Sequence, residues 1–130
     1  MSNRRKFIQN LTAISAMAIM PQITKAENQK NTKMIHQVYF WLNEPEKNTA
    51  PFLKAVKTLA KIKTIKSSYI GTPAPTERRP VVDHSFQVAC TFFFDSLEDQ
   101  LDYQSDPDHL KFIEENSDKW NKVQVYDFTI

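Results

Sequence analysis

The run over residues 82–94 (VDHSFQVACTFFF) constrains the fold of this chain more than any other stretch. It is long, nearly continuous in apolar residues and rich in aromatic side chains, a pattern typical of a strand in the middle of a sheet. Side chains alternate between the two faces of a strand, so one face would carry His84, Phe86, Val88, Cys90, Phe92 and Phe94. The run therefore predicts a central strand that is buried on both faces.

Three more strands are expected, at residues 33–42, 67–71 and 123–129. The first, KMIHQVYFWL, is rich in β-branched and aromatic residues, with His36 on one face and Tyr39 and Trp41 on the other. Gly71, the single glycine of the chain, ends the second strand, and the prolines of residues 72–80 predict a loop after it. Because both faces of the first strand are largely apolar, it should also be covered on both sides.

Two short helices, residues 97–103 and 107–120, are expected to meet at a sharp corner. A side chain suited to N-capping precedes each helix: Ser96 for the first and Asp106 for the second. The second helix begins with a proline. The backbone N–H at the first helical position has no partner within the helix, so a proline, which lacks that N–H, fits there without losing a hydrogen bond. Tyr103 would end the first helix and His109 would lie in the first turn of the second. The corner therefore holds a phenol and an imidazole near one another.

With an amphipathic helix predicted at residues 47–63, the order of elements is β-α-β-β-α-β. This is the split βαβ pattern of ferredoxin-like domains, an α+β fold with helices on one side of a four-stranded sheet. The opposite sheet face would carry Tyr39, Trp41, Ala89 and Phe93, which is too apolar to leave in water. We therefore expect a homodimer in which two such faces close into a dimeric α/β barrel.

The first 26 residues have the pattern of a signal peptide, with a basic start, an uncharged apolar run at residues 11–20 and small residues at the end. The apolar run is too short to span a bilayer. Arg4 and Arg5, followed by Lys-Phe-Ile, resemble the twin-arginine export motif, although Asn3 and Gln9 depart from it. We expect export, to the periplasm, without a stable membrane anchor.

The predicted organisation is a signal peptide at 1–26, a flexible tether at 27–32 and one domain at 33–130. The leader contains four of the 17 basic residues and none of the 15 acidic ones, so the remaining chain carries a net charge of −2. This charge gives no indication of nucleic-acid binding. Cys90, the single cysteine, cannot form an internal disulfide and is interpreted as a small buried hydrophobic residue.

Several motifs occur in the order and at the spacing found in one known family. They are His-x-Val-x-Phe at residues 36–40, Phe-Asp-Ser at 94–96, the segment from Tyr103 to the Asp-Pro-Asp-His of 106–109, and Val-Tyr-Asp-Phe at 125–128. In these motifs the chain resembles the Dabb family, the stress-responsive dimeric α/β-barrel proteins. The resemblance covers about residues 34–129, essentially the whole predicted domain.

The resemblance implies a set of candidate site residues. The best-understood enzyme of the family is olivetolic acid cyclase, which closes a linear polyketide by aldol chemistry without a cofactor. At the matching positions this chain has Tyr103 and His109, which the resemblance implies are catalytic, and His36 and His84, which it implies bind the ligand. The family often has His-Pro-x-His at the corner, whereas this chain has Asp106 in place of the first histidine.

These patterns support two hypotheses about function. The first is cofactor-independent acid–base chemistry, of lyase, cyclase or isomerase type, on a small carbonyl-bearing molecule, with His109 as general base and Tyr103 stabilising an enolate. The alternative is a non-catalytic module that binds a small ligand or has a stress-related structural role. The three histidines show no spacing typical of a zinc site, so neither a metal nor a cofactor is expected.

Overall fold

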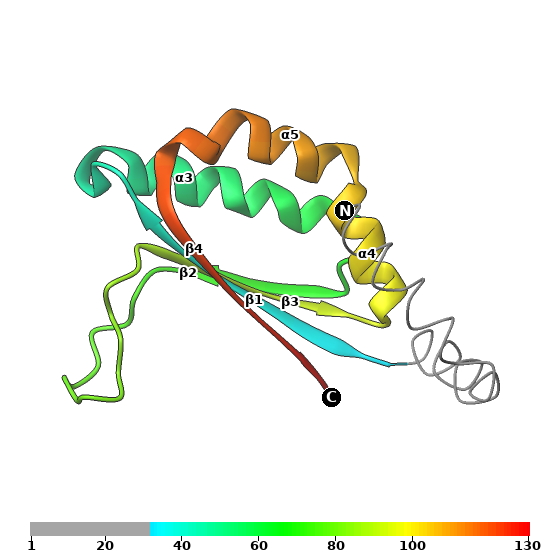
Figure 1. The fold of residues 1–130 in the computed structure, drawn as a ribbon, viewed down its shortest axis with the longest axis horizontal. Helices are drawn as coiled ribbons and strands as arrows, with labels where there is room; N and C mark the ends of the chain where they lie inside the picture. Colours follow the sequence, from blue (N-terminus) through cyan, green and yellow to red (C-terminus); the bar gives the residue numbers. More distant parts are fainter. Residues whose placement is uncertain (1–31) are drawn as a thin grey trace, which may run out of the picture.

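The computed structural model of the chain describes residues 32–130, which form a four-stranded antiparallel sheet with helices on one face (Figure 1). The predicted signal peptide and all but the last residue of the predicted tether lie outside the described residues, so export and its route stay predictions. Within residues 32–130, no helix combines the length and the apolar composition needed to cross a membrane.

The sheet is built from β1 (Met34–Leu42), β2 (Ser67–Gly71), β3 (Val88–Phe94) and β4 (Trp120–Thr129), in the spatial order β2-β3-β1-β4. The helices are α3 (Pro45–Thr58), α4 (Leu97–Ser105) and α5 (Pro107–Asn116), and the 3₁₀ turns η2 (Leu59–Lys61) and η3 (Ser117–Lys119) extend α3 and α5. This arrangement confirms the predicted ferredoxin-like α+β fold.

The core lies between the sheet and the helices. Alternate residues of β1 and β3 are buried against the helices, while the residues between them are only half-buried. Phe52 of α3 is fully buried, and its ring centroid lies 4.8 Å from that of Phe40 on β1. Such edge-to-face packing of aromatic rings fixes α3 over the central strands.

The helical corner forms as predicted. The Ser96 hydroxyl accepts a hydrogen bond from the backbone N–H of Asp99 at 3.0 Å, which caps α4. The carboxylate of Asp106 accepts one from the backbone N–H of Asp108 at 2.8 Å, and Pro107 occupies the first position of α5. Two caps separated by one break therefore set the angle between α4 and α5.

The predicted strand at residues 82–94 is wrong in its first half, because β3 begins only at Val88. On one side of β3, the neighbouring strand β2 ends at Gly71, which pairs with Ala89. β2 therefore offers no backbone partner to the residues before Val88. On the other side, the last backbone contact with β1 is from the N–H of Gln87 to the carbonyl of Phe40 at 2.9 Å; beyond it, the backbone N–H of Leu42 donates to the Gln87 side chain at 2.7 Å and not to a strand backbone. A strand without neighbours loses its hydrogen bonds, so residues 82–87 belong to the connection between β2 and β3.

That connection, residues 72–87, projects from the body of the domain on the side of the sheet away from the helices (Figure 1). We call it the arm. The sheet face on this side, which we call the open face, carries Tyr39 and Trp41 as predicted, together with Tyr126 and Phe128 of β4, which are 57% and 47% exposed. Within the described chain only the base of the arm contacts this face, where Phe86 packs on Tyr39 and the Ser85 hydroxyl accepts a hydrogen bond from Trp41 Nε1; no helix or second sheet covers it.

Candidate active site

A cavity of about 190 Å³ lies between the sheet and α5, beside the helical corner. Most of its lining is apolar, and three polar aromatic side chains join it: His36 from β1, Tyr103 from α4 and His109 from α5. An apolar cavity with a few convergent polar groups is the usual form of a small-molecule site. The structure therefore brings three of the four predicted site residues to one cavity.

His109 has one ring nitrogen committed and one available. Its Nδ1 lies 3.0 Å from the backbone carbonyl oxygen of Gln104, and a carbonyl only accepts, so Nδ1 carries the proton. In the neutral ring, Nε2 then keeps its lone pair. Burial lowers the pKa of His109, and the positive charge that His36 can carry lowers it further, against opposing effects of Gln104 and Asp106. His109 is therefore a neutral imidazole that can accept a proton at neutral pH.

Tyr103 is held as a neutral phenol. Its side chain is only 2% exposed, and its ring packs 5.7 Å from Phe92 and 5.4 Å from Phe94, centroid to centroid. Burial raises the pKa of its hydroxyl, so the group stays protonated and can donate a hydrogen bond. Within residues 32–130 the structure shows no hydrogen bond from this hydroxyl, which leaves it free to bind a ligand in the cavity.

His36 forms a pair that the sequence analysis missed. Its Nδ1 lies 2.5 Å from Oδ1 of Asp127, and its ring centroid lies 5.8 Å from that of Tyr103. His36 is buried and Asp127 is half-exposed on β4, directly opposite His36 in the strand register. The carboxylate fixes which ring nitrogen of His36 carries a proton, in the manner of carboxylates that orient catalytic histidines. One feature of the sequence could have indicated this pair: Asp127 is an acidic residue on the otherwise apolar, helix-facing side of the last strand.

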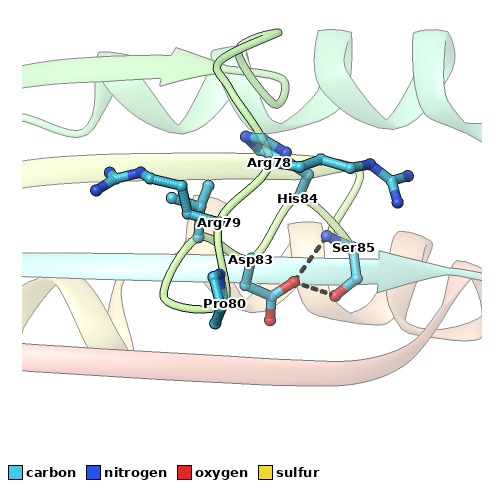
Figure 2. Close-up of a pocket in the computed structure, with 7 residues that line it drawn as sticks. Arg78, Arg79, Pro80, Asp83, His84 and Ser85 are labelled. Carbon is cyan, nitrogen blue, oxygen red and sulfur yellow. Dashed lines mark hydrogen bonds between the residues drawn. The ribbon is translucent and has the colours of Figure 1, made fainter.

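His84 does not share this cavity. It lies in the arm, where its Nε2 is 2.8 Å from the Thr76 hydroxyl oxygen, and it lines an open hollow of about 700 Å³ formed by the arm itself (Figure 2). The interpretation that placed His84 on the third strand facing the helices was wrong, because β3 begins four residues later. A ligand-binding role for His84 stays a prediction and would concern a different surface.

The cavity can provide proton transfer and hydrogen bonding. Within residues 32–130, no group of three or more His, Cys, Asp or Glu side chains is arranged to hold a metal ion. Cys90 also lines the cavity, and burial raises the pKa of its thiol to about 12, so it is present as the unreactive thiol. Of the groups around the cavity, His109 is the candidate base and Tyr103 the candidate hydrogen-bond donor.

Comparison with known families places the chain. The model of the Dabb family, described as a stress responsive A/B barrel domain, matches residues 34–130. The chain belongs to the Dabb family. The match spans every strand and helix of the described domain, so the family assignment that the sequence motifs predicted is confirmed. Among curated proteins, a search by sequence found no match.

Solved structures share the Dabb fold of this chain. A Dabb protein from Mesorhizobium loti with a ferredoxin-like fold has a TM-score of 0.62 and 20% identity, covering 75% of this chain and 95% of its own. The hydroxynitrile lyase of Passiflora edulis has a TM-score of 0.61 and 22% identity, covering 77% and 94%. A dimeric ferredoxin-like protein of Thermobifida fusca has a TM-score of 0.61 and 17% identity, covering 78% and 93%. At these identities the likeness establishes the fold.

Proposed function

We propose that this Dabb domain binds a small carbonyl-bearing molecule in the cavity at the helical corner and performs cofactor-independent acid–base chemistry on it. The observation that carries the proposal is the pairing of His109, neutral with its Nε2 available, and Tyr103, protonated with its hydroxyl unoccupied, on one apolar cavity. A base and a hydrogen-bond donor side by side are the minimum for enolate chemistry.

The proposed step is proton abstraction next to a carbonyl. His109 Nε2 takes a proton from the carbon beside the carbonyl, the electrons of that C–H bond form a C=C bond, and the carbonyl electrons move onto oxygen. The Tyr103 hydroxyl donates a hydrogen bond to this oxygen as its negative charge develops. The enolate can then be reprotonated, attack a second carbonyl or expel a leaving group, which are isomerase, cyclase and lyase outcomes.

His36 is proposed to contact the ligand from the sheet side. With its Nδ1 on Asp127, the other ring nitrogen is available to a ligand in the cavity that both His36 and Tyr103 line. The similarity of Tyr103, His109 and His36 to the site positions of olivetolic acid cyclase supports this arrangement. The fold shared with the Passiflora edulis hydroxynitrile lyase supports a lyase reaction as one form of the chemistry.

The proposal includes assembly and location. We infer that two copies associate through their open faces as a homodimer, which is supported by the exposed aromatic residues of that face and by solved structures of the fold described as dimeric. We also infer that residues 1–26 export the protein to the periplasm, which rests on the leader pattern alone. The ligand would then be a small molecule present outside the cytoplasm.

Hydrogen–deuterium exchange at carbon tests this function without knowledge of the natural substrate. The purified protein is incubated in D₂O with a panel of small ketones, β-dicarbonyl compounds and hydroxynitriles, and NMR follows both deuterium at the carbon beside the carbonyl and cleavage of the hydroxynitriles. We expect one or more compounds to exchange or react faster than in buffer. Compounds that bind, as seen by line broadening, but never exchange or react would favour the non-catalytic binding module.

A further inference from the structure

The arm, residues 72–87, is a braced structure whose base, Ser85 to Gln87, packs against β1: the Trp41 indole N–H donates to the Ser85 hydroxyl at 2.8 Å, and the Phe86 ring lies 5.1 Å from that of Tyr39. Its prolines restrict the backbone, the Thr76 hydroxyl contacts His84 Nε2 at 2.8 Å, and the backbone N–H of Val82 donates to the carbonyl of Arg79 at 2.9 Å. The Asp83 carboxylate accepts hydrogen bonds from the Ser85 backbone N–H and hydroxyl (Figure 2). A preordered segment loses less conformational entropy on binding a partner than a flexible one.

The tip of the arm, residues 78–81, presents side chains that the described domain leaves unused. Val81 is 83% exposed, more than any other large hydrophobic residue described. Arg78 and Arg79 extend to opposite sides of the arm (Figure 2), and neither takes part in either of the two ion pairs found in residues 32–130. An apolar knob flanked by two unpaired guanidinium groups is a surface suited to protein recognition.

The open face contains a matching depression. A hollow of about 210 Å³, which we call the aromatic hollow, is lined by Tyr39, Trp41, Asp83, Phe86, Gln124 and Tyr126. The ring centroid of Tyr39 lies 5.1 Å from that of Phe86 and 6.1 Å from that of Tyr126. Lys122 Nζ lies 4.4 Å from the Trp41 ring centroid, so that ring already holds a cation, and Tyr126 on β4 is an aromatic wall of the hollow that an arginine can stack on. Aromatic walls beside a carboxylate suit an arginine with neighbouring apolar groups.

We propose that in the homodimer the arm tip of each copy docks in the aromatic hollow of the other copy. This inference rests on the proposed homodimer and specifies one contact between its two copies. The arm leaves the sheet on the side of the open face (Figure 1), so a second copy seated on that face meets the arm. In the docked tip, Val81 loses its exposed surface to the aromatic rings, and an arginine stacks on Tyr126 beside the carboxylate of Asp83. The exchange is reciprocal, as an isologous interface requires.

Sedimentation equilibrium of the purified chain and its variants tests the docking. Val81→Ser and the double variant Arg78→Ala with Arg79→Ala should each raise the dimer dissociation constant by about tenfold or more, as loss of an interface hot spot does. Leu110→Ser is the matched control, because Leu110 is also exposed, at 53%, but lies on α5 on the opposite side of the sheet. It should leave dissociation unchanged.

A further variant separates this inference from the dimer itself. Phe128 lies on the open face outside the hollow, and Phe128→Lys should weaken any dimer built on that face. If Phe128→Lys weakens the dimer while the tip variants match the wild type, the docking is wrong and the dimer stands. If the wild type is a monomer at micromolar concentration, both are wrong.

Disulfide trapping gives a second readout that does not depend on affinity. Copies carrying Val81→Cys are mixed with copies carrying Tyr126→Cys and oxidised; the native Cys90 is buried and serves as an inert background. The docked arrangement predicts a covalent dimer in the mixture and much less in either variant alone. A dimer that persists but gives no mixed disulfide would contradict the docking.

Discussion

The ring of Tyr103, at the end of α4, lies 4.4 Å from the ring of His109, in the first turn of α5, measured between centroids. The contact crosses the break that Asp106 and Pro107 impose on the chain. Local sequence signals therefore produce the geometry on which the proposed chemistry depends. Because the two side chains come from different helices held by separate caps, each can be substituted without removing the cap of either helix.

The first prediction concerns Tyr103→Phe, which removes one hydroxyl and keeps the buried ring. The reaction rate at saturating ligand should fall by roughly tenfold to 1000-fold, with ligand affinity changed little, because the hydroxyl acts on charge that develops only in the transition state. Steady-state kinetics and calorimetric titration measure the two quantities. If kcat/KM falls by the same factor as ligand affinity while kcat is unchanged, the hydroxyl acts in binding alone.

The second prediction concerns pH and His109. Burial holds the pKa of folded His109 below its ordinary value of 6.5, so the unfolded chain binds a proton more readily than the folded one. Protonation of His109 therefore costs the folded state nothing above about pH 6.5. As the pH falls from there through the lower pKa of the folded state, the free energy of unfolding decreases. Urea unfolding between pH 7 and pH 5 should show a smaller decrease for His109→Gln than for the wild type. Parallel curves would indicate that the pKa of His109 is not lowered.

The third prediction compares two carboxylates. Asp127→Ala leaves the buried Nδ1 of His36 without its partner, which should lower the free energy of unfolding by about 1 kcal/mol, since water reaches the half-exposed end of the pair. Asp95→Ala removes the exposed pair with Lys66 and should cost less than about 0.5 kcal/mol. Urea denaturation measures both. Similar small effects would mean that Asp127 does not fix His36.

The fourth prediction concerns export. Replacing Arg4 and Arg5 together with lysine should stop secretion by the twin-arginine route, whose receptor reads the arginine pair, whereas the general secretory route needs only positive charge. Western blots of periplasmic and cytoplasmic fractions measure the outcome. Undiminished periplasmic protein in the lysine variant would retain export but assign it to the general route.

Local patterns predicted much of this fold, and non-local pairing accounts for what they missed. Ser96 and Asp106 could be identified as caps because capping depends on a few adjacent residues. The start of β3 at Val88 could not, because it depends on where two distant strands stop offering partners, and His84 was misplaced for that reason. Asp127 was missed because its meeting with His36 depends on the β1–β4 register.

The most direct test of the proposed function compares two histidine substitutions in the deuterium-exchange reaction. His109 lines the cavity and His84 lies in the arm, so His109→Gln and His84→Gln make the same chemical change inside and outside the proposed site. The account predicts that exchange at carbon falls by roughly 100-fold or more in His109→Gln, the usual scale for loss of a general base, and is unchanged in His84→Gln, with both proteins folded by circular dichroism. Exchange that is equally fast in His109→Gln and in the wild type would contradict the account.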